Sequence, residues 1–220
     1  MRVFAGLVVV ILAAACGGAN DVATGNDAAS LQEIGPGTVT PVAAHSGRTE
    51  KAVFAGGCFW CTEADFDKVP GVIATTSGYT GGHVADPTYN QVSAGGTGHV
   101  EAVEITYDPA VISYEQLLQV YWRSIDPFSA HGQFTDVGEQ YRPAIFALTP
   151  EQEKAAKASQ AAIDARVSRP TVVSIEQGSC FYVAEAEHQD YHSRNPARYG
   201  LYRRLSGRDS SLEKIWGSHP

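Results

Sequence analysis

The chain has 220 residues, a length that suits one globular domain with an additional terminal segment. Hydrophobic residues make up 44% and aromatic residues 10%, which is ordinary for a protein with a packed core. The formal net charge is −8 and there is no dense block of Lys and Arg, which argues against nucleic acid or an anionic membrane surface as a partner. Arg203, Arg204 and Arg208 form too short a run to change this, and we expect them in a solvated tail.

The first 15 residues are typical of a signal peptide. Arg2 precedes an unbroken small and apolar run over residues 3–15, and Cys16 follows. The run is too short to span a membrane, which takes roughly 20 apolar residues. Small residues before a cysteine resemble a bacterial lipoprotein signal, so we expect cleavage to leave Cys16 as a lipid-carrying N-terminus. Ordinary secretion after Ala15 is the alternative, since Ala13 stands where a larger aliphatic residue is commoner.

A flexible linker is expected next. Residues 17–47 are rich in Ala, Gly, Asn, Asp, Thr and Ser and contain no aromatic residue, a composition that cannot form a core. The sequence therefore predicts a signal peptide over residues 1–15, an anchor cysteine with a linker over residues 16–48, and a folded domain over residues 49–216.

Strands and helices alternate through this domain. The patterns predict strands over residues 51–55, 72–79, 99–107, 143–148 and 171–175. They predict helices over residues 59–69, 113–123, 149–166 and 185–192. Residues 80–98 and 126–140 are expected to be long loops. This order predicts an α/β (α+β) layer architecture with a mixed β-sheet.

A cysteine stands where the first strand passes into the first helix. The apolar run over residues 52–55 ends in Gly56 and Gly57, and Cys58 follows. Unpaired amide N–H groups and the macrodipole at a helix N-terminus favour an anion, so we expect the Cys58 thiol to ionise near neutral pH. Phe59 and Trp60 come next and are expected to hold a small apolar group beside the thiolate.

A second cysteine lies one helical turn further on. Cα atoms at i and i+3 of a helix are about 5–6 Å apart, so Cys58 and Cys61 are within disulfide reach. If Cys16 carries lipid, Cys180 is the third remaining cysteine. An odd number leaves at least one thiol outside any intramolecular disulfide, which suits redox chemistry better than a structural framework.

The segment Gly57-Cys58-Phe59-Trp60 resembles the signature of the peptide methionine sulfoxide reductase A family. Further matches follow in that family's order and spacing across residues 49–205. They are Gly78-Tyr79-Thr80-Gly81-Gly82, Asp86-Pro87-Thr88-Tyr89, Gly98-His99-Val100-Glu101, Tyr107-Asp108-Pro109, Gln140-Tyr141-Arg142 and His188-Gln189-Asp190-Tyr191. The resemblance implies a two-layer ferredoxin-like core and a catalytic domain that reduces methionine-S-sulfoxide, free or in proteins. It implies no metal and no bound organic cofactor.

The resemblance also implies roles for individual residues. Cys58 falls on the nucleophile, which becomes a sulfenic acid, and Glu101 falls on the acid that protonates the departing oxygen. Tyr89, Tyr141 and Asp136 fall on the oxygen side of the pocket. Phe59 and Trp60 fall on the residues that bind the ε-methyl group of the substrate. From residues alone, Glu101 could instead be the solvent-facing member of an alternating strand.

The sequence departs from the family pattern in its recycling cysteines. Many members place them near the C-terminus, after the Asn-Pro that corresponds to Asn195-Pro196, where this chain has none. Cys61 stands where glycine is common, so Cys61 is the expected resolving thiol and Cys180 the runner-up. We expect a thioredoxin-like protein to reduce the resulting disulfide. We expect a monomer attached only through its lipid to the periplasmic or outer face of a bacterial membrane.

Three other functions are compatible with parts of the sequence. A general thiol-disulfide oxidoreductase would use Cys58 and Cys61 but not Glu101. A cysteine hydrolase would pair Cys58 with a histidine such as His99. A surface-anchored binding lipoprotein would explain the linker but not the thiol pair. A zinc site at His188 and His192 is not expected, because no third ligand is evident.

Overall fold

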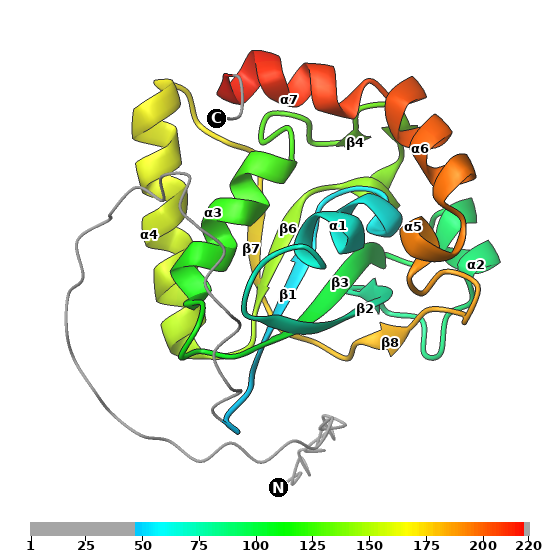
Figure 1. The fold of residues 1–220 in the computed structure, drawn as a ribbon, viewed down its shortest axis with the longest axis horizontal. Coiled ribbons are helices and arrows are strands. Elements are labelled where there is room, and N and C mark those ends of the chain that lie inside the picture. The colour runs from blue at the N-terminus through cyan, green and yellow to red at the C-terminus, as the bar shows by residue number, and fades with distance from the viewer. Residues whose placement is uncertain (1–46, 218–220) are drawn as a thin grey trace, which may run out of the picture. The chain divides into compact units, whose positions relative to one another are not determined.

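The computed structural model describes residues 47–217, and a six-stranded β-sheet runs through them (Figure 1). The predicted signal peptide, Cys16 and most of the predicted linker lie outside the described residues. Across the sheet the strands follow the order β7-β6-β1-β3-β2-β8. Their bounds are β1 Glu50–Ala55, β2 Val72–Thr80, β3 Val100–Tyr107, β6 Ala144–Ala147, β7 Ser174–Gln177 and β8 Tyr182–Val183. The pair β6 and β7 is parallel and the other neighbours are antiparallel, so the predicted mixed sheet is confirmed.

Four strands and two helices form the predicted ferredoxin-like core. Helix α1 covers Phe59–Phe66 and helix α3 covers Tyr114–Ser124. Along the chain the core runs β1-α1-β2-β3-α3-β6, and in space its strands lie in the order β6-β1-β3-β2. The strands β7 and β8 extend this core at its two edges.

The main core lies between the sheet and the helices α1 and α3, which cover one of its faces (Figure 1). Phe54 of β1 stacks on Phe66 of α1 at 5.5 Å between ring centroids and on Tyr121 of α3 at 5.0 Å. Val53 and Ala55 point to the opposite face because side chains alternate along a strand. Burying an aromatic side chain of this size stabilises the fold by roughly 2–3 kcal/mol.

The helix starts follow the sequence signals. The Ser113 hydroxyl accepts a hydrogen bond from the Gln116 amide and the Gln116 side chain accepts one from the Ser113 amide, which forms a capping box at the start of α3. Thr149 caps helix α4, Pro150–Val167, and Pro150 takes its first position. These boundaries could be predicted because the signals are local.

Three predicted segments differ from the structure in detail. The loop predicted for residues 80–98 contains helix α2, Tyr89–Ala94, which Thr88 and Gln91 start with a capping box that the surrounding glycines obscured. The loop predicted for residues 126–140 contains the hairpin strands β4, Gly132–Gln133, and β5, Asp136–Val137, followed by the 3-10 helix Glu139–Tyr141. The helix predicted for residues 185–192 is a turn followed by helix α5, Tyr191–Arg194.

The strand predicted for residues 171–175 begins later, as β7. The amide of Thr171 donates to Asp164 at 2.8 Å and the amide of Val172 donates to the Pro127 carbonyl at 2.8 Å. These amides are therefore occupied outside the sheet, and pairing with β6 starts only at Ser174.

The expectation of a solvated arginine tail was wrong. Helices α6, Pro196–Leu205, and α7, Arg208–Trp216, pack on the domain, and Arg208 is only 1% exposed. Its guanidinium donates to the Ser124 carbonyl at 2.7 Å and to the Gly56 carbonyl at 2.9 Å. A guanidinium with its N–H donors satisfied by buried carbonyls can lie inside the protein, which a charge count cannot reveal.

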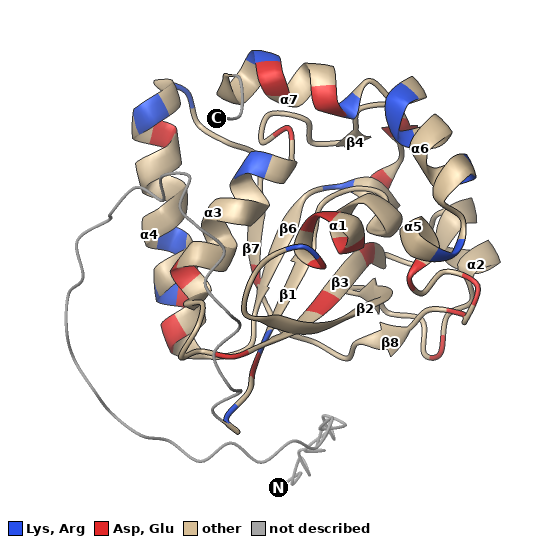
Figure 2. Cartoon of the chain, viewed as in Figure 1, with Lys and Arg blue, Asp and Glu red and all other residues tan. Residues whose placement is uncertain are grey.

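Charged side chains lie mainly on the outer elements. Figure 2 shows acidic and basic side chains interspersed on α4 and α7, whereas the charged side chains of α6 are all arginines. Within the described residues, no helix has the length and apolar character needed to cross a membrane.

Candidate active site

The turn between β1 and α1 places Cys58 at the start of a helix, as the sequence predicted. Gly57 has φ +87°, and a Cβ atom there would lie 2.5 Å from Cβ of Gln133. Glycine is therefore required both for the backbone conformation and for the close approach of the loop. Cys58 takes the N-cap position of α1 and is 6% exposed.

Cys58 and Cys61 form a pair of thiols inside the protein. Both are free, and the Cys61 amide donates to the Cys58 carbonyl at 3.1 Å within the first turn of α1. Cys61 has no exposed surface. The two side chains are within hydrogen-bonding reach of each other.

The pKa values of the two thiols are moved in opposite directions. Burial raises the pKa of Cys58, and the nearby Cys61 and Glu101 raise it further. The hydrogen bond with Cys58 lowers the pKa of Cys61 to about 7, and the charges of Arg208 and Arg203 assist against the effect of burial. The sequence led us to expect the lowered pKa at Cys58, whereas the structure gives it to Cys61. Because the thiols share a hydrogen bond, the first proton lost belongs to the pair.

Glu101 lies beside this pair and is almost completely buried. It is 2% exposed, and its Oε2 atom accepts a hydrogen bond of 2.9 Å from the amide of Phe59. Burial raises the pKa of Glu101 to about 8, and the charge of Asp136 adds to the rise while the Phe59 amide opposes it. Glu101 is thus not the solvent-facing member of its strand, and at neutral pH its carboxyl group holds a proton that it can donate.

Tyr89, Tyr141 and Asp136 come from three different elements to this site. Tyr89 begins α2 and Tyr141 ends the 3-10 helix, while Asp136 belongs to β5. Burial raises the pKa of both tyrosines, and the charges of Glu101 and Cys58 contribute to both rises. The hydroxyl groups therefore stay protonated near Cys58 and can donate hydrogen bonds to an oxygen atom there.

Phe59 and Trp60 form an aromatic wall that other rings support. The Phe59 and Trp60 ring centroids are 6.4 Å apart, and Trp60 stacks on Tyr191 at 3.8 Å. His188 lies 5.2 Å from Phe59 and 4.3 Å from Tyr89, and its Nδ1 atom accepts a hydrogen bond from the Trp60 indole at 3.3 Å. The wall is therefore fixed by the His188-Gln189-Asp190-Tyr191 segment.

Two residues at the site were missed by sequence reasoning. The Tyr202 hydroxyl donates to Oδ2 of Asp136 at 2.5 Å and lies within hydrogen-bonding reach of the Cys58 sulfur. The Arg208 guanidinium lies next to Gly57, and its Cζ atom is 4.5 Å from the centroid of the Phe134 ring, over which it stacks. Both residues come from the C-terminal helices, where the arginine run suggested a solvated tail. Helical periodicity was the only local signal there, and it does not identify a partner.

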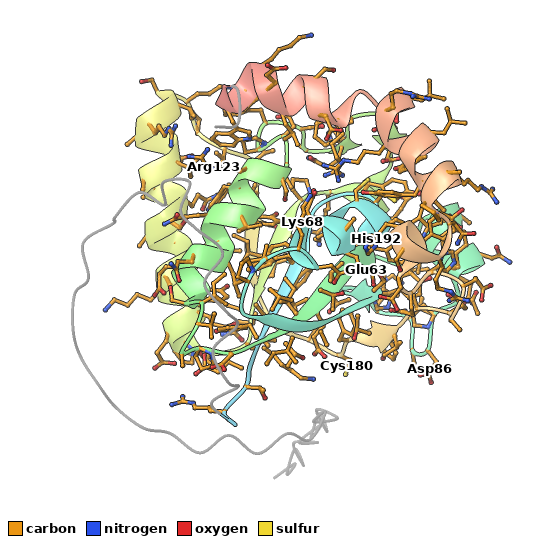
Figure 3. The ribbon with its side chains drawn as sticks, in the orientation of Figure 1. Glu63, Lys68, Asp86, Arg123, Cys180 and His192 are labelled. Carbon is orange, nitrogen blue, oxygen red and sulfur yellow. The ribbon has the colours of Figure 1, made fainter. Side chains whose placement is uncertain are left out.

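Two other residues from the sequence analysis lie elsewhere. Cys180 precedes β8 at the sheet edge, where its carbonyl accepts from the Thr80 hydroxyl at 3.1 Å, and Figure 3 shows it apart from α1. His99 is 3% exposed, and its ring nitrogens bond to the Gly82 amide and the Val84 carbonyl. A histidine occupied in this way is not available as the base of a cysteine hydrolase.

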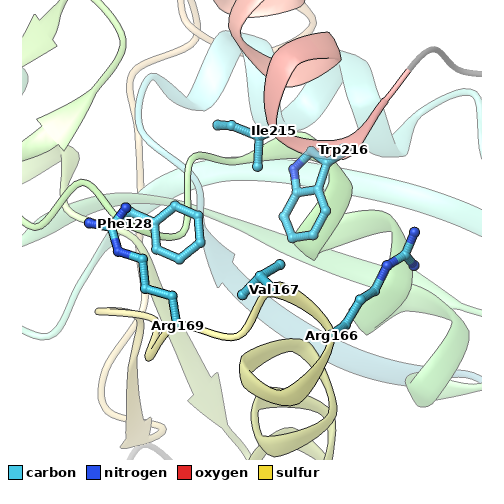
Figure 4. A pocket seen from close by; sticks show the side chains of 6 residues that line it. All are labelled: Phe128, Arg166, Val167, Arg169, Ile215 and Trp216. Carbon is cyan, nitrogen blue, oxygen red and sulfur yellow. The ribbon is translucent and has the colours of Figure 1, made fainter.

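The structure also contains hollows outside the thiol site. One of about 530 Å³ lies between the C-terminal ends of α4 and α7 and is lined by Phe128, Arg166, Val167, Arg169, Ile215 and Trp216 (Figure 4). Another of about 680 Å³ lies beside α1, near Asp65, Tyr199 and Arg203. Among residues 47–217 no group of three or more His, Cys, Asp or Glu side chains is arranged to hold a metal ion.

Comparisons with known proteins agree on one family. A family model described as peptide methionine sulfoxide reductase matches residues 50–220. The chain is 50% identical over 169 residues to a peptide methionine sulfoxide reductase MsrA of Listeria innocua, covering 76% of this chain and 96% of that protein.

Solved structures give the same result. The reduced form of Mxr1 from Saccharomyces cerevisiae aligns with a TM-score of 0.66 and 27% identity, covering 71% of this chain and 91% of that one. Methionine sulfoxide reductase A of Corynebacterium diphtheriae aligns with a TM-score of 0.61 and 31% identity, covering 68% and 77%.

Proposed function

Because the chain belongs to the peptide methionine sulfoxide reductase family, its activity is the reduction of methionine sulfoxide, and we propose that Cys58 and Glu101 carry out the reaction. One observation carries the proposal. The Glu101 carboxyl group accepts a hydrogen bond from the amide of Phe59, the residue after Cys58. Burial raises the pKa of Glu101 to about 8, so the carboxyl group is protonated at neutral pH. A general disulfide oxidoreductase would not need an acid to protonate a departing oxygen.

The first step transfers the sulfoxide oxygen to the enzyme. The Cys58 thiolate attacks the sulfoxide sulfur, and Glu101 gives its proton to the oxygen, which would otherwise leave as a poorly stabilised anion. The sulfur–oxygen bond of the substrate breaks and the oxygen ends on Cys58. Methionine and a Cys58 sulfenic acid are the products, and Glu101 is left as a carboxylate.

The pocket selects one stereoisomer of the sulfoxide. Phe59 and Trp60 provide apolar contact for the ε-methyl group, while the hydroxyls of Tyr89 and Tyr141 bond the oxygen on the other side. A tetrahedral sulfur whose methyl group and oxygen are both fixed fits in one configuration. On the family's precedent we assign the S-sulfoxide, free or in proteins.

Cys61 resolves the sulfenic acid. Its sulfur lies within hydrogen-bonding reach of Cys58, and the positive charges of Arg208 and Arg203 favour its thiolate form. Attack on the Cys58 sulfur forms a disulfide and releases the hydroxyl group, which leaves as water with one proton. Cys180 is disulfide-bonded and lies at the sheet edge, apart from α1, so it is the less favoured candidate.

A thioredoxin-like dithiol protein then reduces the disulfide. Cys58 is 6% exposed and Cys61 is fully buried, so the incoming thiolate attacks the Cys58 sulfur and Cys61 leaves. A thiol of lower pKa leaves faster, which favours the same direction. The second thiol of the reductant then breaks the mixed disulfide and restores Cys58.

We also propose that the enzyme is an exported lipoprotein that acts outside the cytoplasm as a monomer. The apolar run over residues 3–15, the cysteine at position 16 and the linker after it support this. Mass spectrometry of the mature N-terminus should find a lipid on Cys16, and Cys16→Ser should release the enzyme from membranes or block its maturation. An unmodified N-terminus at another residue would contradict the lipid anchor.

Reduction of the two methionine sulfoxide epimers with dithiothreitol tests the chemistry. The wild type should convert the S epimer and leave the R epimer essentially unchanged, whereas Cys58→Ser should convert neither. Equal turnover of both epimers would contradict the pocket assignment. Retained activity in Cys58→Ser would contradict the nucleophile.

A further inference from the structure

The nucleophile is buried in surroundings that oppose its ionisation. Cys58 is 6% exposed, and burial raises its pKa. The ionisable side chains that interact with it are Cys61 from α1, Glu101 from β3, Tyr89 from α2, Tyr141 from the 3-10 helix and Tyr202 from α6. Glu101 is already assigned as the acid, so it is not the group that accepts the Cys58 proton.

Tyr202 connects Cys58 to a second carboxyl group. Its hydroxyl donates to Oδ2 of Asp136 at 2.5 Å, a short hydrogen bond typical of an ionised acceptor. The same hydroxyl lies within hydrogen-bonding reach of the Cys58 sulfur. The Tyr202 ring packs edge-on against Trp60, with centroids 5.9 Å apart and an interplanar angle of 84°, so the hydroxyl is held in place.

The direction of these hydrogen bonds follows from the proton count. A tyrosine hydroxyl has one proton and two lone pairs. When its proton is donated to Asp136, its oxygen can accept from the Cys58 thiol. The resting arrangement is thus a chain from the thiol through the hydroxyl to the carboxylate.

We propose that Tyr202 is a catalytic residue that relays the proton of the Cys58 thiol to Asp136 and so generates the attacking thiolate. This rests on the proposed role of Cys58. The sulfur–hydrogen bond breaks as Tyr202 takes that proton and passes its own to Asp136. Tyr202 ends unchanged, Asp136 becomes a carboxylic acid and Cys58 a thiolate, so one negative charge moves from Asp136 to the sulfur.

The relay also stabilises its product. Once Asp136 is protonated, the Tyr202 hydroxyl is free to turn its proton toward the Cys58 thiolate, as a charge-assisted hydrogen bond. The two carboxyl groups at the site then have opposite roles. Asp136 accepts the proton before attack, and Glu101 supplies one during it.

The test measures the rate at which iodoacetamide alkylates Cys58 as a function of pH. It uses the full mature chain carrying Cys61→Ser, and mass spectrometry quantifies the alkylated Cys58 peptide. Tyr202→Phe keeps the ring against Trp60 and removes the hydroxyl. It should slow alkylation at pH 7 about tenfold and raise the midpoint of the profile by about one pH unit. Asp136→Asn should change the rate and the midpoint by similar amounts. The double variant Tyr202→Phe/Asp136→Asn should show no larger change than either single variant. Tyr107→Phe, whose hydroxyl bonds to Glu50 at 2.9 Å, is the matched control and should leave the profile unchanged.

Single-turnover kinetics on the S-sulfoxide provide the second measurement. Tyr202→Phe should lower the maximal rate about tenfold with little change in the substrate concentration at half-maximal rate. A wild-type alkylation profile in Tyr202→Phe would overturn the relay, as would independent, additive effects of Tyr202→Phe and Asp136→Asn. If Cys58→Ser is inactive while Tyr202→Phe behaves as wild type, only the relay fails. Activity in Cys58→Ser would instead reject the nucleophile itself.

Discussion

The backbone amide of Phe59 donates a hydrogen bond of 2.9 Å to Oε2 of Glu101, although the two residues are 42 positions apart in the sequence. Phe59 directly follows Cys58, so the start of α1 fixes the nucleophile and the acid relative to each other. The hydrogen bond favours the carboxylate, whereas burial favours the neutral acid. Burial dominates, which leaves the pKa of Glu101 at about 8.

Replacing the acid should slow oxygen transfer without preventing binding. Glu101→Gln keeps the shape of the side chain but cannot donate a carboxylic proton. We expect methionine formation in a single turnover to slow by about 10²–10⁴-fold, the usual contribution of general acid catalysis. Glu104→Gln, on the same strand but paired with Lys51 on the opposite face, is the control. Wild-type rates in Glu101→Gln would refute the role.

The rate of the first turnover should fall at high pH. It should decrease as Glu101 loses its proton near pH 8, because the carboxylate can no longer protonate the departing oxygen. In Glu101→Gln the falling limb should disappear because no acid titrates there. Stopped-flow measurements from pH 5 to 10 check this, and a falling limb that persists in the variant would assign it to another group.

Cys61 should be dispensable for one turnover and required for many. Cys61→Ser should reduce about one equivalent of S-sulfoxide per enzyme, because oxygen transfer needs only Cys58 and the acid. Continued turnover with a thioredoxin-like protein should fail, since sulfenic acid accumulates where a disulfide is required. Cys180→Ser is the matched control and should cycle normally. The reverse result, with the Cys180 variant stalled and the Cys61 variant cycling, would make Cys180 the resolving thiol.

A buried acid in α1 should make stability depend on pH. Glu63 has no exposed surface, and burial together with the charge of Asp67 raises its pKa to about 7 (Figure 3). A carboxyl group with a raised pKa binds its proton more tightly in the folded state. Its contribution to stability is therefore present below about pH 4.5 and is lost as pH rises toward 7.

Glu63→Gln should remove this loss. We expect the free energy of unfolding at pH 8 to increase by about 2 kcal/mol relative to wild type, with a smaller difference at pH 4.5. Urea unfolding at the two pH values measures it, and the exposed Glu151→Gln serves as control. An identical pH dependence in wild type and Glu63→Gln would show that Glu63 does not ionise in this range.

The sequence alone determined the features that depend on neighbouring residues. Gly56 and Gly57 after an apolar run predicted the strand end and the helix start at Cys58. Alternation of strand and helix patterns predicted the mixed sheet, and the i, i+3 spacing placed Cys58 and Cys61 in one turn. These predictions succeeded because turn geometry, capping and periodicity act over a few residues.

Only the tertiary structure decided which side chains surround the Cys58 sulfur and which of them are protonated. A strand's alternation fixes two faces but not which face is buried, so the surroundings of Glu101 came from the packing of α1 on the sheet. Tyr202 and Arg208 reach the site from helices far along the chain, and no local pattern gives a contact over such a separation. The lower pKa of Cys61 relative to Cys58 arises from the hydrogen bond between the thiols and from the positive charges of Arg208 and Arg203 near Cys61. Burial and charge are properties of the assembled fold, because desolvation depends on everything that surrounds a group.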